Sequence, residues 1–173
     1  MKINCVIVTY NRLSLLKECI SALKNQTYKI NKIYIINNNS TDGTSDYLQK
    51  LIADSQFVII NLPQNIGEAG GFSEGIKRVV LDGCDWAWIM DDDTIPMNNA
   101  LEELVKGTTV AKNVGYVCSR VVWTDGMIHK MNIPRFDCEN KQHLPINYYS
   151  NLADVLLIRA ASFVSLLINS KAV

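Results

Sequence analysis

The chain has 173 residues, of which 48% are hydrophobic and 20% are charged. This balance is typical of a globular domain and excludes the disordered and fibrous classes. The 17 Lys and Arg residues match the 17 Asp and Glu residues, which argues against nucleic acid as a partner, because nucleic-acid-binding domains carry a basic excess.

The sequence also bears on where the protein works. The apolar run at residues 3–8 is too short for a secretory signal, and the apolar stretch at 152–168 contains Asp154 and Arg159 and is too short for a membrane span. Five scattered cysteines, with no Cys-x-x-Cys pair and only two histidines, argue against a zinc cluster and fit a reducing compartment. We therefore expect a cytoplasmic protein, and peripheral attachment to the inner face of the membrane stays open.

Residues 1–106 alternate between two hydrophobic periods. Short apolar runs rich in β-branched residues predict four buried strands, at residues 3–8, 33–36, 57–60 and 86–90. Apolar residues at helical spacing predict helices between them, at residues 13–23, 47–52 and 72–80. Asn11 is available as the N-cap of the first helix. This alternation predicts an α/β fold, with a Rossmann-like, mainly parallel sheet and helices on both faces.

The pattern changes after residue 107. Residues 114–123 predict one or two strands, residues 124–126 a turn, and residues 137–150 a polar loop. Two further apolar segments, at 155–158 and 163–168, fit either strands or buried helix. We expect a single domain over residues 1–173, with a looser, mixed C-terminal part.

Asp91, Asp92 and Asp93 directly follow the fourth predicted strand. Alternate side chains of an extended chain point the same way, so Asp91 and Asp93 can converge while Asp92 points elsewhere. Two neighbouring carboxylates repel each other unless a cation lies between them, and oxygen ligands favour Mg²⁺ or Mn²⁺. The pattern predicts a divalent-cation site at Asp91 and Asp93, with a solvated acidic loop as the alternative. An Asp-x-Asp-x-Thr phosphatase is excluded because Ile95 stands where that motif needs threonine.

Polar or glycine-rich loops follow the other three strands, at residues 9–12, 37–44 and 65–75. Glycine lets a backbone approach a ligand closely, and a helix N-terminus favours negative charge. Gly71 and Gly75 are four residues apart and could instead let a helix pack closely on the sheet. Ligands bind where the strand order of such a sheet reverses, which we expect between the first and fourth strands. The predicted site therefore binds a sugar nucleotide. It offers a cation for the diphosphate, side-chain amides for the base and glycine N–H groups for close approach of the ligand.

Four motifs in order resemble the landmarks of family 2 glycosyltransferases, which have the GT-A fold. They lie at residues 6–12 (VIVTYNR), 38–44 (NNSTDGT), 65–67 (NIG) and 91–93 (DDD). The resemblance covers residues 1 to about 106 and implies a nucleotide-sugar-binding half at 1–106 and an incomplete acceptor-side half at 107–173. Residues 67–71 and 88–96 are similar to those of galactofuranosyltransferases and, less closely, of bacterial rhamnosyltransferases.

The resemblance implies metal-dependent, inverting transfer of a galactofuranose-like sugar from a UDP-sugar to a glycan or lipid-linked glycan in surface polysaccharide assembly. Mn²⁺ or Mg²⁺ would be the cofactor, with Asp91 and Asp93 as its ligands. Asn37 stands where the family commonly has an Asp that accepts a hydrogen bond from uracil, and Glu68 departs from the glycine of the galactofuranosyl branch. The implied nucleotide-sugar-binding residues are Thr9, Asn11, Arg12, Asn37, Asn65, Gly67, Gly70, Gly71 and Asp92.

The catalytic base is not assigned. In the family it lies in a downstream acidic motif, often followed by His, and we expect it outside these residues because no later acid has that context. The acids considered are Asp125, Asp137, Glu139 and Asp154. Two alternatives stay open: a nucleotide-sugar-binding module without turnover, and a dTDP-rhamnose-dependent rhamnosyltransferase, since thymine and uracil share one pairing edge. Uncovered apolar residues at 156–168 would favour a homo-oligomer.

Overall fold

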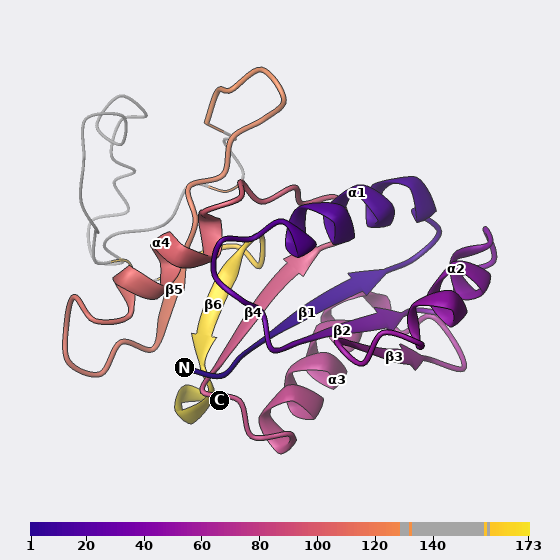
Figure 1. Cartoon of the computed structure of the whole chain (residues 1–173), viewed down its shortest axis with the longest axis horizontal. Helices are drawn as coiled ribbons and strands as arrows, with labels where there is room; N and C mark the ends of the chain where they lie inside the picture. Colours follow the sequence, from indigo (N-terminus) through magenta and orange to yellow (C-terminus); the bar gives the residue numbers. More distant parts are fainter. Residues whose placement is uncertain (129–131, 133–157, 159) are drawn as a thin grey trace.

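The computed structural model of the chain describes residues 1–128, 132, 158 and 160–173 (Figure 1). The predicted polar loop at 137–150 and most of the apolar segment at 155–158 lie outside these residues, as do Asp137, Glu139 and Asp154. In the described part no helix is long and apolar enough to cross a bilayer.

The described strands form one six-stranded sheet in the order β3-β2-β1-β4-β6-β5. The four predicted strands are confirmed as a parallel set, and two short antiparallel strands extend the sheet beyond β4. The strands are β1 (Ile3–Thr9), β2 (Lys32–Asn37), β3 (Phe57–Asn61), β4 (Trp86–Asp91), β5 (Tyr116–Cys118) and β6 (Leu166–Asn169). Because β1 has β2 on one side and β4 on the other, the strand order reverses at β1, as predicted.

The helices cover both faces of the sheet, which confirms the predicted layers. One apolar core joins the sheet to α1, α2 and α4, and a second core joins the opposite face to α3. The helices are α1 (Leu13–Lys24), α2 (Thr44–Leu51), α3 (Gly67–Leu81), α4 (Ala100–Gly107) and the short η2 (Ser170–Ala172). All residues of β1 are buried, as expected for a central strand covered on both faces. Figure 1 shows the two termini next to each other, at the end of the sheet where β1 begins.

Two glycines bring α3 close to the sheet. A Cβ atom added at Gly71 would lie 2.6 Å from Val8 Cγ1, and one added at Gly75 would overlap Val6 Cγ1. This confirms the packing role for the pair, while ligand contact by Gly71 stays a prediction. This close packing places the first turn of α3 beside the ends of β1 and β2.

The later part of the chain folds back on the sheet. The predicted turn at 124–126 is confirmed, since Val122 bridges Ile128 around it and the Trp123 N–H donates to the Met127 carbonyl at 2.7 Å. The apolar segment at 163–168 supplies β6, which lies between β4 and β5. Trp88 of β4 donates from Nε1 to Ser165 Oγ at 3.1 Å, so this return is fixed by a buried polar contact as well as by strand pairing.

Candidate functional site

The predicted convergence of strand ends is confirmed by direct contacts between their loops. The Asn38 N–H, just after β2, donates to the Thr9 carbonyl at the end of β1 at 2.9 Å. The Asn38 side chain, 2% exposed as a residue, accepts from the Ile66 N–H at 2.9 Å and donates to the Gly67 carbonyl at 3.0 Å. Asn38 therefore joins β2 to the start of α3.

Asp92 is the buried member of the acidic trio, with 3% exposure. Its Oδ2 accepts from Thr9 Oγ1 at 2.7 Å, and the Tyr10 N–H also hydrogen-bonds to it. Burial raises the pKa of Asp92, while the Thr9 hydrogen bond and the Arg12 charge oppose that rise. Asp92 thus links the end of β4 to the end of β1, and its predicted place near the donor sugar stays a prediction.

Asp93 is the exposed member and pairs with Arg12. Arg12 Nη1 lies 2.8 Å from Asp93 Oδ2 and 3.5 Å from Asp92 Oδ1. The Arg12 and Asp93 side chains are 52% and 48% exposed, so water screens this pair. Arg12 therefore lies at the acidic trio, and its predicted contact with the donor stays a prediction.

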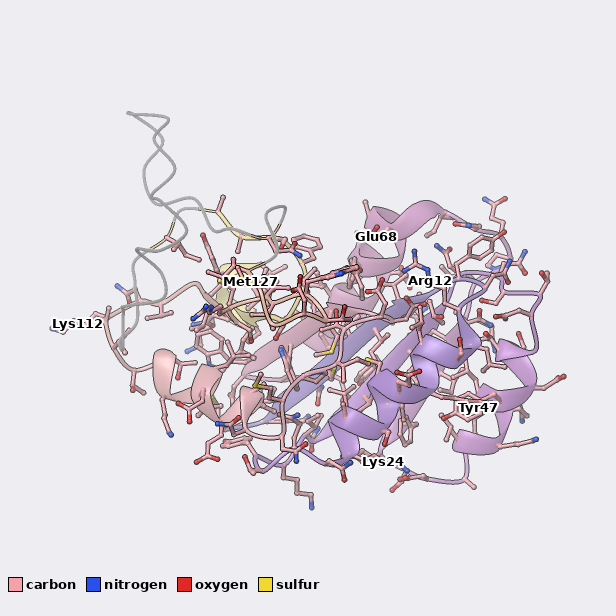
Figure 2. The ribbon with its side chains drawn as sticks, turned by 90° about the horizontal axis from the view of Figure 1, so that it is seen from above. Arg12, Lys24, Tyr47, Glu68, Lys112 and Met127 are labelled. Carbon is pink, nitrogen blue, oxygen red and sulfur yellow. The ribbon has the colours of Figure 1, made fainter. Side chains whose placement is uncertain are left out.

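Asp91 faces a different partner, Glu68 in the first turn of α3. Burial, followed by the charge and the hydrogen bond of Glu68, raises the pKa of Asp91 to about 7, and the charges of Asp93 and Asp92 add to the effect. A hydrogen bond between two carboxyl groups requires a proton on one of them. Figure 2 shows Arg12, at the start of α1, and Glu68, at the start of α3, on the same edge of the molecule.

The trio therefore has two sides, with Asp91 toward Glu68 and Asp93 toward Arg12. In the described part of the chain, no group of three or more His, Cys, Asp or Glu side chains is arranged to hold a metal ion by itself. Asp91 and Asp93 as a cation-binding pair stay a prediction.

Asn11 is not the N-cap of α1, contrary to the sequence prediction. It adopts a positive φ of 54°, and its Oδ1 accepts from the Thr41 N–H at 2.7 Å while its own N–H donates to Ser40 Oγ at 3.0 Å. The cap position belongs to Arg12, whose side chain makes no capping bond. Asn11 instead joins the loop after β1 to the loop after β2.

Asp42 supplies the missing cap from a distant part of the chain. Its Oδ2 accepts from the Leu13 N–H at 3.0 Å, and its Oδ1 accepts from the Thr44 N–H at 3.2 Å and Thr44 Oγ1 at 2.6 Å. One carboxylate therefore caps both α1 and α2. Sequence reasoning missed Asp42: the contact with Thr44 is a local motif, but the contact with Leu13 spans 29 residues.

Asn37 is 1% exposed, and its side chain is engaged within the protein. Its Nδ2 donates to Ser45 Oγ and Asn61 Oδ1, each at 2.9 Å, and its Oδ1 accepts from the Ser40 N–H at 3.0 Å. A carbonyl oxygen has a second lone pair, so the predicted uracil contact stays a prediction.

Asn65, Gly67 and Gly70 shape the turn into α3. Asn65 Oδ1 accepts from the Gly67 N–H at 2.8 Å, and Gly67 has a left-handed φ of 77° that favours glycine. A Cβ atom at Gly70 would lie 2.9 Å from Ile66 Cγ1. The structure places these residues at the edge that carries the acidic trio, and their ligand contacts stay predictions.

The fold and the family comparison agree on the class of protein. The sheet and helix order are those of the GT-A fold, and the model of Glycosyl transferase family 2 matches residues 5–165. The chain belongs to this family.

Curated relatives match a little over half of the chain. It is 28% identical over 93 residues to poly-beta-1,6-N-acetyl-D-glucosamine synthase of Staphylococcus aureus, covering 54% of this chain and 22% of that protein. It is 27% identical over 96 residues to galactofuranosyltransferase GlfT1 of Mycolicibacterium smegmatis, covering 56% of this chain and 31% of that protein. The matched region thus spans less than a third of each relative.

Solved structures share the fold at low sequence identity. Residues 1–349 of S. aureus TarS match 99% of this chain and 48% of theirs, with a TM-score of 0.70 and 15% identity. The mannosyltransferase PcManGT of Pyrobaculum calidifontis, in complex with GDP-Man and Mn²⁺, matches 69% of this chain and 36% of its own, with a TM-score of 0.58 and 19% identity. TarS in complex with UDP has a TM-score of 0.58, with 15% identity, and covers 84% of this chain and 38% of its own.

Proposed function

We propose that the chain carries the donor-binding half of an inverting glycosyltransferase, which transfers a galactofuranose-like sugar from a UDP-sugar to a glycan or lipid-linked glycan. The observation that carries this proposal is the meeting of Thr9, Arg12 and the acidic trio where the strand order of a GT-A sheet reverses. That crevice is where α/β sheets bind ligands. Residues 1–106 would hold the donor, and residues 107–173 would form part of the acceptor side.

The acidic trio fits a divalent cation, Mn²⁺ or Mg²⁺. The raised pKa of Asp91 reflects burial and neighbouring negative charge, which a bound cation would offset. Mg²⁺ is commonly held by one or two carboxylates together with substrate phosphates, so Asp91 and Asp93 need no third protein ligand. When bound, such an ion stabilises the charge on a diphosphate leaving group. The Mn²⁺ and GDP-Man in the PcManGT complex support this role.

The donor is proposed to be a UDP-sugar because TarS is known in complexes with UDP and UDP-GlcNAc, and GlfT1 is a galactofuranosyltransferase. Surface polysaccharide assembly at the cytoplasmic face of the membrane, with peripheral attachment there, is proposed for the same reason: one relative is a polysaccharide synthase. The catalytic base is proposed to lie outside residues 1–173, since none of their later acids has the context of the family's acidic motif. Asp125 accepts from the Met127 N–H in its own turn, which is a structural role.

A nucleotide-sugar-binding module without turnover is the second candidate, because the proposed site residues bind the donor or the cation and none is assigned as the catalytic base. A dTDP-rhamnose donor and self-association stay predictions of the sequence. Assays of donor hydrolysis and sugar transfer separate an enzyme from a module, since a module binds without turnover.

The central test is calorimetric titration of UDP and dTDP with and without Mn²⁺. We expect Mn²⁺ to strengthen UDP binding, and Asp91→Ala and Asp93→Ala to remove that gain while the protein stays folded. The matched control is Asp54→Ala, because Asp54 is 45% exposed and ion-paired to Lys24, away from the trio. Equal Mn²⁺-dependent binding by parent and the two site variants would contradict the cation site, and preference for dTDP would favour the rhamnosyl donor.

A further inference from the structure

Arg12 lies where both proposed ligands would affect it. A divalent cation would compete with Arg12 for the carboxylates, and a diphosphate would bind the Arg12 guanidinium. The guanidinium contacts both Asp92 and Asp93, and it is the cation that ion-pairs with the trio in the described part of the chain. A divalent ion would need the same negative charge. A donor diphosphate, in turn, is the kind of anion that a guanidinium binds with paired hydrogen bonds.

The guanidinium can leave the trio without stranding a buried charge. Asp92, with a side chain only 4% exposed, keeps its bonds from Thr9 and from the Tyr10 N–H when Arg12 moves. Asp93 is half exposed and regains water. An ion pair at this level of exposure contributes little to stability, so the cost of opening it is small.

The backbone of Arg12, unlike its side chain, is fixed. Its carbonyl accepts from the Leu16 N–H at 3.0 Å, and the next residue, Leu13, is held by Asp42. The side chain beyond it is 52% exposed and has several rotatable bonds. The first turn of α1 has no acidic residue, so the guanidinium adds to the positive end of the helix dipole. This geometry provides a fixed base and a head group that can reorient toward an anion.

We propose that Arg12 is an exchangeable counter-ion that pairs with Asp92 and Asp93 in the ligand-free protein and turns to the donor diphosphate when Asp93, together with Asp91, binds a divalent cation. The proposal rests on the proposed function and adds a coupling to it. Cation alone must displace Arg12, whereas cation together with diphosphate gives Arg12 a new partner. Binding of each ligand then favours the other, and by linkage the coupling is reciprocal.

Arg12→Gln tests the exchange because it should shift two affinities in opposite directions. We expect Mn²⁺ alone, followed by electron paramagnetic resonance, to bind about threefold to fivefold more tightly, the scale of an exposed ion pair. We expect UDP at saturating Mn²⁺, followed by calorimetry, to bind about tenfold more weakly, the scale of a charge-assisted hydrogen bond. Arg12→Lys keeps one positive charge and should leave the affinity for Mn²⁺ alone close to that of the parent.

The matched control is Arg78→Gln. Arg78 Nε lies 2.8 Å from Glu74 Oε1 on α3, and the Arg78 side chain is 53% exposed, which is similar to the pair of Arg12 and Asp93. We expect Arg78→Gln to change neither the affinity for Mn²⁺ nor the affinity for UDP. Thermal denaturation of each variant checks that it is folded.

Weaker binding of Mn²⁺ alone by Arg12→Gln would show that Arg12 merely positions the carboxylates and would overturn the exchange. An unchanged affinity for Mn²⁺ alone would overturn it as well, while Mn²⁺-dependent UDP binding by the parent would leave the proposed function standing. A parent protein that binds neither Mn²⁺ nor UDP would overturn both.

Discussion

Acidic residues at the two ends of the parallel sheet have pKa values shifted in opposite directions. At the end where the strands begin, Asp82 accepts from Lys32 Nζ at 3.0 Å and lies 3.9 Å from Lys2 Nζ. Hydrogen bonds from Lys32 and then Tyr34 hold the pKa of Asp82 below its usual value. At the end where the strands finish, burial and neighbouring carboxylates raise the pKa of Asp91 to about 7.

This difference indicates that the acidic charge at the first end stabilises the fold, whereas the acidic charge at the other end is available to a ligand. Asp82 at the first end is ion-paired with Lys2 and Lys32, and because its pKa is lowered in the folded state its ionisation favours folding. At the other end Arg12 is ion-paired with Asp92 and Asp93, while Asp91 contacts a further acid, Glu68. The acids at this end, where the sequence predicts a cation, thus outnumber the cation paired with them in the described part of the chain.

The largest effect should come from Thr9→Val, which removes the hydroxyl donor to buried Asp92 at nearly constant volume. We expect the free energy of unfolding to fall by about 2 kcal/mol, because a buried charged group loses a hydrogen bond. Urea denaturation measures this. Thr9→Ser keeps the donor and should recover most of the loss; equal stability of Thr9→Val and the parent would show that Asp92 is not held as described.

Asp42→Ala should rank next, since one carboxylate caps two helices. We expect a loss of about 1–2 kcal/mol in the free energy of unfolding, the usual cost of removing a cap. UDP affinity should fall too, because the start of α1 positions Arg12. Asp42→Asn keeps one acceptor oxygen and serves as the graded control. A variant as stable as its parent would contradict the double cap.

Asp91→Asn should stabilise the metal-free protein, in contrast to the first two changes. Asp91 binds its proton more tightly when folded, so its contribution to stability is lost as pH rises from the usual 3.8 toward about 7. In EDTA at pH 8 the variant should gain ~1 kcal/mol, or about 2–4 °C in Tm. The gain should shrink toward pH 4. A variant less stable than its parent at pH 8 would mean that Asp91 is charged and well solvated.

Asp82→Asn should give the smallest change and the opposite sign. The pKa of Asp82 is lowered in the folded state, so its stabilisation is present above the usual 3.8 and is lost as pH falls through the folded value. The variant should melt slightly below its parent at pH 7, and the gap should close in acid. Relative to the parent, the Tm of Asp91→Asn should therefore rise and the Tm of Asp82→Asn should fall as the pH increases. Tm differences with the same pH dependence in both variants would contradict the difference between the two ends of the sheet.

Much of the fold was predictable because its signals are local. Buried strands covered on both faces appear as continuous apolar runs, and the polar loops after them are confirmed at one edge. The meeting of Thr9 with the trio follows from parallel order and strand reversal. The pair Gly71 and Gly75 was open to two interpretations, and only the contacts with Val6 and Val8 decided for packing.

What the sequence did not predict depends on contacts between distant segments. Asn11 has the propensity of a cap, but a positive φ turns it toward Thr41, and Asp42 reaches Leu13 instead. Glu68 departs from the glycine of the galactofuranosyl branch, and its hydrogen bond to Asp91 depends on how closely α3 lies against the sheet. No pattern within one segment carries that information.

The late return of β6 leaves one side of β4 unpaired while the chain is being synthesised. Residues 86–89 of β4 pair with residues 166–169, so one side of β4 has no partner until the ribosome has made nearly eighty more residues. An open edge is a template for pairing with another chain, and a closure this distant in sequence forms slowly. We therefore expect chains that end between α4 and β6 to aggregate more readily than the full chain, because one side of β4 then stays unpaired.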